Sequence, residues 1–279
     1  MPKLTGHRYG KGRVRVLKIL REGPTHRIKD INVSALLEGD FESSYTKGDN
    51  SRVVATDTIK NTVNVLAKEN LGDEIERFAI FLGEHFVTKY PQVESATVDV
   101  AERAWDRMNI DGKPHTHSFS GNDGSRMFSH VVCARGSRVI QSGVRDLIIL
   151  KSTESGFEDY PKDEFTTLRE TTDRILATSF SAKWTWAKLP ANFQKANDAI
   201  LAAMLKVFAN NFSPSAQTTL FQMGEAALTA CAEVSRLEMA MPNKHCLLID
   251  LTPFGLDNRN EVFVPIDEPH GQIEATIER

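Results

Sequence analysis

The spacing of apolar residues along the first half of the chain changes between that of strands and that of helices. In GRVRVLKIL, residues 12–20, apolar residues recur at every second position, which is typical of a strand. Near Thr56 a short apolar run gives way to apolar residues spaced three and four apart, as in a helix. Pro91 ends the helix that follows. In chain order, the first half predicts strands over residues 12–20 and 28–45, helices from near Thr56 and over residues 73–90, and strands over residues 93–108 and 126–136.

The second half predicts the same order of elements. We expect strands over residues 137–152 and 174–189, the latter reached through a short capped segment at 166–171, then helices over residues 197–212 and 215–233, then strands over residues 236–242, 244–251 and 261–266. The duplication predicts two domains, residues 1–136 and 137–279. The expected fold class is α+β, with antiparallel sheets and paired helices on one face. Closure into a barrel through other subunits would remove the exposed strand edges.

Composition narrows the classes of function. The 34 basic and 37 acidic residues leave a net charge of −3, which argues against nucleic acid or an anionic membrane as the main partner. No apolar run approaches the roughly 20 residues that span a bilayer, and MPKLTGHRYGKG lacks the apolar segment of a signal peptide. Cys133, Cys231 and Cys246 lack metal-type spacing and are expected to be small buried residues in a reducing compartment. We therefore expect a soluble cytoplasmic protein.

Two predicted helix starts carry polar residues. Thr56 or Asp57 can cap the first helix through a side-chain oxygen, a contact worth on the order of 1 kcal/mol. Ser213 is the expected N-cap of the second, which places Ala216 and Gln217 in its first turn. The backbone N–H groups of a first turn lack partners within the helix and lie at the positive end of its dipole. Two such starts in one pocket would bind a small, flat, anionic molecule.

Several other residues each allow a structural and a functional interpretation. His245, with Asn243 at the mouth of an expected strand, is either a hydrogen-bonded structural histidine or part of a proton relay. Lys11, between two glycines, is either exposed or a base whose pKa is lowered by partial burial. Arg174 is either a surface residue or a binding residue whose planar guanidinium donates paired hydrogen bonds to a carboxylate or a ring edge. Phe157, in a polar stretch, either anchors a loop or offers a stacking surface.

His115 and His117, two residues apart in DGKPHTHSF, could bind a metal only with further ligands. No Glu-x-x-His or Cys-x-x-Cys spacing supports such a site, so a hydrogen-bonded loop is expected there and no metal. The chain also lacks a dinucleotide-binding glycine fingerprint.

Seven stretches together resemble the urate oxidase (uricase) family of the tunnelling-fold superfamily, over roughly Tyr9 to Gly271. They are YGKGRVRV, LLEGDFESSYTKGDNSRVVATDTIKNTV, RMNIDGKPHTHSF, LKSTESGF, DEFTTLRETTDRIL, SAQTTLFQM and MPNKHCLLIDL. The resemblance implies oxidation of urate by O2 to 5-hydroxyisourate and hydrogen peroxide, without a cofactor. It also implies a homotetramer with a central tunnel and active sites between subunits, to which one chain contributes Lys11 and Thr56 and its neighbour the remainder. The last residues, ATIER, do not form the peroxisomal signal of many eukaryotic members, which favours a bacterial-type cytosolic enzyme.

The residues that match the family's catalytic positions are Lys11, Thr56 and His245. Those that match its substrate-binding positions are Thr56, Asp57, Phe157, Arg174, Ala216, Gln217 and Asn243. By this resemblance Phe157 stacks under the purine, Arg174 and Gln217 clamp its edge, and Asn243 lies over the ring where oxygen or water sits. Ala216 stands where valine is common in the family. By the resemblance, Ala216 and Asp57 each contact the substrate through the backbone N–H.

The implied chemistry suits these residue types. Ground-state O2 reacts sluggishly with closed-shell molecules, and enzymes usually supply a metal or a flavin for it. Deprotonated urate is itself rich enough in electrons to pass one to O2. The protein then has only to hold the ring, stabilise its charge and move protons. Two alternatives remain: a zinc-dependent tunnelling-fold hydrolase acting on a pterin, with His115 and His117 as ligands, and a purine-binding protein without catalysis.

Overall fold

The structure, a computed structural model, describes residues 2–122 and 124–279. The chain divides into two compact units. The first comprises Met1–Gly143 with Lys188–Gln194, and the second comprises Val144–Ala187 with Lys195–Arg279.

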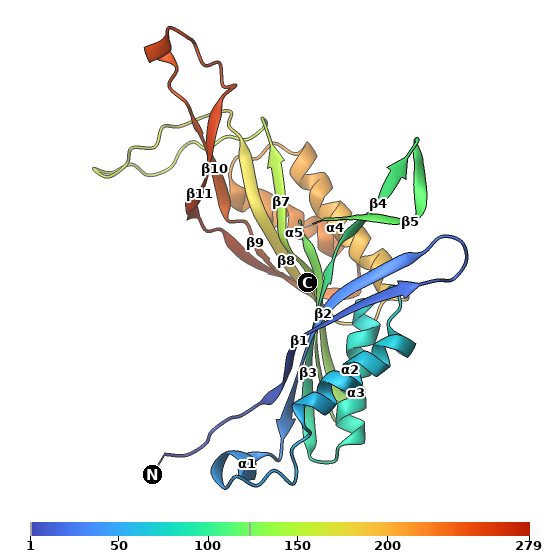
Figure 1. The fold of residues 1–279 in the computed structure, drawn as a ribbon. Coiled ribbons are helices and arrows are strands. Elements are labelled where there is room, and N and C mark those ends of the chain that lie inside the picture. The colour runs from blue at the N-terminus through green and yellow to red at the C-terminus, as the bar shows by residue number, and fades with distance from the viewer. Residues whose placement is uncertain (1, 123) are drawn as a thin grey trace. The chain divides into compact units, whose positions relative to one another are not determined.

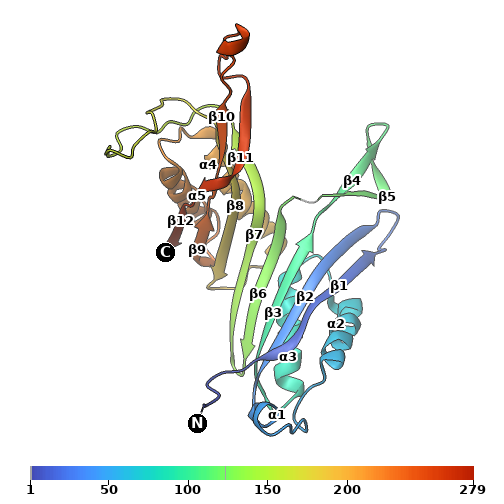
Figure 2. The ribbon, with the colours of Figure 1, turned by 60° about the vertical axis from the view of Figure 1, so that its left-hand side comes forward.

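The first unit is an antiparallel sheet with two helices on one face (Figure 1). Its strands follow the order β1-β2-β3-β6, which Figure 2 shows clearly. The bounds of these elements are β1 (Tyr9–Leu20), β2 (Arg27–Gly39), β3 (Val93–Arg103), β6 (Arg126–Ala134), α2 (Thr56–Asn70) and α3 (Ile75–Lys89). A short helix, α1 (Glu42–Thr46), follows β2, and a separate hairpin consists of β4 (Trp105–Ile110) and β5 (Lys113–Gly121).

The alternating pattern of β2 positions the core of the first unit. Ile31, Val33, Ala35 and Leu37 are all fully buried, so one face of the strand lies entirely in the core. The helices contribute a matching set of fully buried side chains, namely Ile59 and Val63 from α2 and Phe78, Leu82 and Phe86 from α3. Each such side chain stabilises the fold by about 1.5–3 kcal/mol relative to an exposed one.

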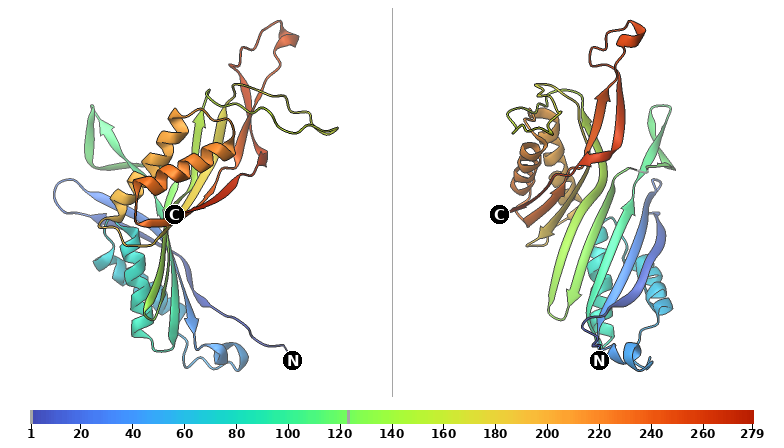
Figure 3. Two further views of the ribbon diagram at one scale, coloured as in Figure 1. Left: turned by 180° about the vertical axis from the view of Figure 1, so that it is seen from behind. Right: turned by 90° about the vertical axis from the view of Figure 1, so that its left-hand side faces the viewer.

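The second unit is likewise an antiparallel sheet with paired helices, which Figure 3 shows from behind. β7 (Ser137–Lys151) begins in the first unit and continues into the second, where the order is β7-β8-β10-β11 and β9 pairs with β8 and β12. The bounds are β8 (Leu176–Trp186), β9 (Val234–Ala240), β10 (Asn243–Leu248), β11 (Phe263–Gly271), β12 (Glu274–Glu278), α4 (Phe193–Asn210), α5 (Ala216–Ala230) and a 3-10 turn, η1 (Thr252–Phe254).

The predicted α+β class, with antiparallel sheets and paired helices, is confirmed. Among the described residues the strands do not close into a barrel: the strand order begins at β1 and ends at β11. None of the helices in the described part of the chain is both long and apolar enough to cross a membrane.

Some predicted elements are wrong in detail. The strand expected over residues 28–45 ends at Gly39, where the chain has φ of 151° and a Cβ would lie 2.1 Å from the Gln92 carbonyl oxygen; a helix follows. The strand expected over residues 93–108 breaks into β3 and β4. Residues 166–171 form an irregular segment, and β5 and β12 were not predicted.

Candidate active site

A cavity of about 270 Å³ in the second unit brings four of the predicted site residues together. Phe157, Arg174, Asn243 and His245 all line it. They come from a loop after β7, from the segment that leads into β8, and from the start of β10. The cavity thus combines an aromatic ring, a cation, an amide and an imidazole, which is the kind of mixed lining that orients a small polar ligand.

Asn243 and His245 lie where the sheet is interrupted. Asn243 pairs with Thr178 of β8 on one side and with Gly271 of β11 on the other. The pairing of β10 with β11 then shifts register, so that His245 lies opposite Ile266. Such irregularities bend a strand and re-aim its side chains. The Asn243 Nδ2 and His245 Nδ1 atoms are 3.4 Å apart, so amide and imidazole face the same space.

The loop that carries Phe157 is held by backbone hydrogen bonds. Phe157 N–H donates to the Thr171 carbonyl oxygen at 2.7 Å, and Arg174 N–H donates to the Ser155 carbonyl oxygen at 2.7 Å. The Phe157 ring stacks on Tyr160, with centroids 4.9 Å apart and planes 13° apart. An aromatic ring backed in this way keeps its plane, as a stacking surface requires. Sequence reasoning missed Tyr160; an aromatic residue three positions after Phe157 was the available signal.

Arg174 is a partly buried cation. Its guanidinium carbon lies 5.2 Å from the centre of the Phe157 ring, and burial lowers the pKa of the side chain from its ordinary value. Its Nε atom is buried without a hydrogen-bond partner among the described residues. A buried donor without a partner costs free energy, and an anion or a carbonyl in the cavity would satisfy it. Arg174 is therefore suited to grip an anionic ring edge.

The second predicted helix start differs from expectation. The N-cap of α5 is Ser215, whose hydroxyl oxygen accepts from Thr218 N–H at 3.1 Å, so the prediction of Ser213 is wrong. Ser213 is instead fully buried, and its hydroxyl donates to the Ser215 carbonyl oxygen. Ala216 and Gln217 do open the helix, the first buried and the second exposed.

The start of α5 is tied to the Phe157 loop. Ser213 N–H donates to the Glu154 carbonyl oxygen at 2.9 Å, and Gly156 N–H donates to the Ser213 carbonyl oxygen at 2.8 Å. These bonds fix the helix start beside the loop. The described lining of the 270 Å³ cavity nevertheless includes neither Ala216 nor Gln217.

Lys11 belongs to the first unit and precedes an irregularity in β1. Pairing with β2 is regular from Tyr9 to Lys11 and shifts register before Val14, and Arg13 between them has φ of 55°. The half-buried Lys11 therefore lies next to a bulge, as Asn243 does in the second unit. The sequence places glycines on both sides of Lys11 but did not predict this break.

Thr56 and Asp57 occupy the first turn of α2 and are both exposed. The N-cap is Ala55, so the prediction that Thr56 or Asp57 caps the helix is wrong. Thr56 is the first helical residue. The Asp57 carboxylate accepts from the Lys60 ammonium and the Asn61 amide, which lower its pKa. The positive charge of Lys11 lowers that pKa further.

Of the nine predicted site residues, three lie in the first unit and six in the second. Those in the first unit are Lys11, Thr56 and Asp57; those in the second are Phe157, Arg174, Ala216, Gln217, Asn243 and His245.

The histidine pair lies on a strand rather than in a loop. His115 and His117 are on β5, with ring centroids 4.6 Å apart. Among the described residues, no group of three or more His, Cys, Asp or Glu side chains could hold a metal ion.

The three cysteines are free. Cys133 and Cys231 are buried as expected, and burial raises the pKa of Cys133 to about 11. Cys246 is only half-buried, against expectation, and lines the 270 Å³ cavity.

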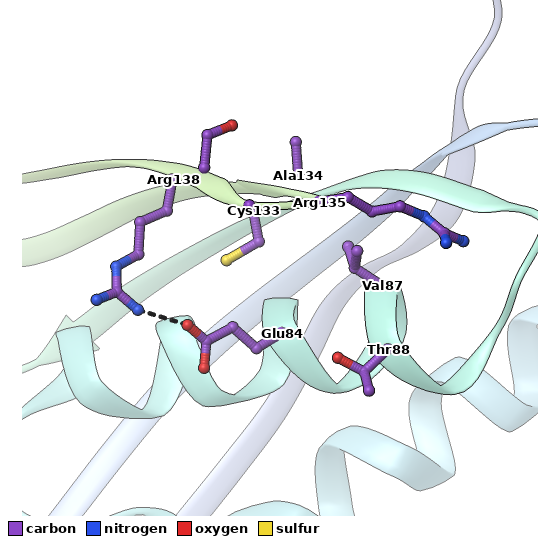
Figure 4. Close-up of a pocket in the computed structure, with 9 residues that line it drawn as sticks. Glu84, Val87, Thr88, Cys133, Ala134, Arg135 and Arg138 are labelled. Carbon is purple, nitrogen blue, oxygen red and sulfur yellow. Dashed lines mark hydrogen bonds and ion pairs between the residues drawn. The ribbon is translucent and has the colours of Figure 1, made fainter.

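A larger groove, about 680 Å³, lies between α3 and the turn from β6 to β7 in the first unit (Figure 4). Arg138 pairs with Glu84 at its rim, and the Arg135 guanidinium donates to backbone carbonyl oxygens. Its described lining includes none of the predicted site residues. Its cations already have partners, so the groove has less to offer an anion than the smaller cavity.

Comparison with known proteins decides the family. The family model described as uricase matches residues 7–131 and 140–274. The chain belongs to the uricase family. The uricase of Arthrobacter globiformis is 41% identical over 273 residues, which cover 98% of this chain and 89% of that protein. The uricase of Dictyostelium discoideum is 38% identical over 283 residues, covering 100% of this chain and 98% of that protein.

Solved structures of uricases share the fold. The crystal structure of uricase from Arthrobacter globiformis superimposes with a TM-score of 0.94 at 40% identity, covering 100% of this chain and 96% of that one. The crystal structure of urate oxidase from Bacillus sp. TB-90 gives a TM-score of 0.82 at 22% identity, covering 98% of this chain and 100% of that one. The second likeness concerns the fold alone.

Proposed function

We propose that this protein is a urate oxidase that converts urate, O2 and water to 5-hydroxyisourate and hydrogen peroxide. The observation that carries the proposal is the match to the uricase family over nearly the whole chain, with relatives named uricase at about 40% identity. The cavity lined by Phe157, Arg174, Asn243 and His245 supports it, because its chemistry suits a flat, anionic purine.

The residues of the second unit bind the ring in this proposal. Arg174 donates two hydrogen bonds to one edge and neutralises its charge, and the Gln217 amide donates and accepts at once. Phe157 stacks on the ring, and Ala216 offers a backbone N–H from the first turn of α5. Asn243 orients O2, and then the attacking water, above the ring plane.

The residues of the first unit, together with His245, move protons. The Thr56 hydroxyl is a poor base alone, but it relays a proton when the Lys11 amine and the His245 imidazole flank it. The Asp57 backbone N–H, in the first turn of α2, contacts the substrate. In this proposal Lys11 and Thr56 of one subunit meet the binding residues of its neighbour.

The electrons come from the substrate. Deprotonated urate passes two electrons to O2, which takes up two protons to become hydrogen peroxide. Water adds its hydroxyl group to the oxidised purine and gives 5-hydroxyisourate. In this proposal neither metal nor cofactor takes part, and the protein contributes geometry, charge stabilisation and proton movement.

The proposed assembly is a cytoplasmic homotetramer whose sheets close into a barrel around a tunnel. The two domains, residues 1–136 and 137–279, would each supply one sheet and one helix pair per subunit. Apolar side chains exposed on the strands support the assembly, among them Ile148 and Leu150 of β7, Leu247 of β10 and Val264 of β11.

A direct assay tests the function. Protein freed of metal is incubated with urate under air, while the ultraviolet absorbance of urate and the formation of peroxide are followed. Loss of urate with matching peroxide is expected. An unchanged urate concentration would refute the proposal, and tight urate binding without oxygen uptake would favour a binding protein instead. The pterin hydrolase is not proposed, since no observation favours it.

A further inference from the structure

Tyr9 links the strand that carries Lys11 to the segment that leads into Thr56. Its hydroxyl oxygen accepts a hydrogen bond from Val54 N–H at 2.7 Å. Val54 is buried and lies two residues before Thr56, while Tyr9 lies two residues before Lys11. One side chain therefore joins the two backbone segments that hold the proposed proton-relay groups of the first unit.

The regular part of β1 relates the directions of Tyr9 and Lys11. Residues two apart on a strand point to the same face, and the pairing of β1 with β2 is regular from Tyr9 to Lys11. Tyr9 points toward the segment before α2, because its hydroxyl bonds to Val54 there. Lys11, on the same face of the strand, therefore points to the same side of the sheet.

Tyr9 is itself held in place. Its ring forms a T-shaped pair with that of Phe41, with centroids 4.8 Å apart and planes 88° apart, and Phe41 is fully buried. The next residue, Gly10, approaches β2 so closely that a Cβ there would lie 1.9 Å from the Ala35 carbonyl oxygen. The hydroxyl is thus presented from a packed ring on a fixed strand.

The segment before α2 has a second support of different origin. The Gln92 side-chain amide donates to the Arg52 carbonyl oxygen at 2.8 Å. Gln92 lies between α3 and β3, so this second support does not come from the strand of Lys11. The Lys18 ammonium of β1 also binds α2, at the Ala67 and Lys68 carbonyl oxygens near the end of the helix. The bond from Val54 to Tyr9 instead joins β1 to the segment directly before Thr56.

We infer that Tyr9 is a positioning residue, which holds the start of α2 so that the Thr56 hydroxyl faces the Lys11 amine. The inference rests on the proposed function, since it assigns Tyr9 to the same proton relay. Tyr9 acts through Val54 and Lys11 rather than on the substrate. Burial raises the pKa of Tyr9, so the phenol is neutral at the pH of an ordinary assay. Replacement by phenylalanine then removes one hydrogen bond and no charge.

The test compares Tyr9→Phe with Tyr45→Phe as a matched control. The Tyr45 hydroxyl also bonds to the backbone, but as a donor, to the Arg8 carbonyl oxygen 3.3 Å away, and in the described part of the chain no hydrogen bond joins it to the segment before Thr56. Tyr9→Phe should lower kcat for urate by about tenfold or more, as expected when a relay group shifts by a fraction of an ångström to one ångström. KM should stay within about twofold, and Tyr45→Phe should retain the kcat of the unchanged enzyme.

A double-mutant cycle separates positioning from general loss of structure. In the Lys11→Met background, Tyr9→Phe should cause no further loss of kcat, because alignment no longer matters once the amine is gone. Hydrogen exchange at the Val54 amide should be faster in Tyr9→Phe and unchanged in Tyr45→Phe.

The outcomes are distinguishable. If the protein without substitutions consumes no urate, the proposed function is overturned. If that protein is active and Tyr9→Phe keeps its kcat, the positioning role is overturned. The positioning role is also overturned if Tyr9→Phe lowers kcat equally with and without Lys11→Met. Unchanged hydrogen exchange at the Val54 amide in Tyr9→Phe would overturn it as well.

Discussion

The Arg174 guanidinium carbon lies 5.2 Å from the centre of the Phe157 ring, at the wall of a cavity of about 270 Å³. A desolvated cation beside an aromatic ring recognises a flat anion with geometry as well as charge. One side chain offers in-plane hydrogen bonds and the other a stacking surface.

The first prediction concerns Arg174→Lys. A lysine keeps the charge but loses the planar fork, so the affinity for a non-reacting urate analogue should fall by about 1.5–3 kcal/mol, roughly 10- to 150-fold. Calorimetric titration measures this. Arg169→Lys is the matched control, because the exposed Arg169 lines the same cavity. Equal affinities for all three proteins would remove Arg174 from the binding site.

The second prediction concerns Tyr160, which backs the Phe157 ring. Tyr160→Leu should raise KM for urate about two- to tenfold, the equivalent of the 0.5–1.5 kcal/mol that an aromatic pair contributes. Steady-state kinetics measure it. Tyr160→Phe keeps the stacked ring and loses only the hydrogen bond to the Leu168 carbonyl oxygen, so its KM should change less. A larger rise in KM for Tyr160→Phe than for Tyr160→Leu would show that the hydroxyl matters and the ring does not.

The third prediction concerns the strand that carries Lys11. Gly10→Ala places a Cβ 1.9 Å from a backbone oxygen of β2, so the two strands must shift apart. The free energy of unfolding should fall by about 1–3 kcal/mol, as overpacking does elsewhere, and kcat should fall with it. Gly12→Ala is the control, since its Cβ would meet only the Ser34 hydroxyl, at 3.7 Å. Chemical denaturation of both variants measures the difference, and equal stabilities would contradict the close approach.

The fourth prediction concerns Lys11→Met and Thr56→Ala. Each should lower kcat by about 10²–10⁴, the range of general acid–base contributions, while a urate analogue still binds. Stopped-flow kinetics and analogue titration measure the two effects. Unchanged turnover in either variant would exclude that residue from the proton relay.

The sequence pattern predicted the class of fold and the order of most elements, because long periodic stretches such as residues 73–90 report burial directly. It did not predict where strands are interrupted. The break after Lys11 and the register shift between Asn243 and His245 depend on how β1 meets β2 and how β10 meets β11. Such cross-strand register is a tertiary property that a single-chain pattern does not contain.

The two helix starts illustrate the same limit. Thr56 and Ser213 both looked like N-caps by residue type, yet the caps are Ala55 and Ser215. Ser213 is drawn into the interior by its backbone bonds to Glu154 and Gly156. Tertiary contacts of this kind outweigh a capping preference of about 1 kcal/mol. The local pattern singled these residues out as candidates but left a structural alternative open for each, and the resemblance to a family assigned their roles.

The stoichiometry of oxygen uptake by protein stripped of metals and flavins tests the proposed cofactor-free mechanism most directly. An oxygen electrode, with urate and peroxide measured in the same sample, gives the ratios. The proposed mechanism predicts that one O2 is consumed and one peroxide formed for each urate lost, with an unchanged rate after stripping. Activity that disappears on stripping and returns only with iron, copper or flavin would contradict it.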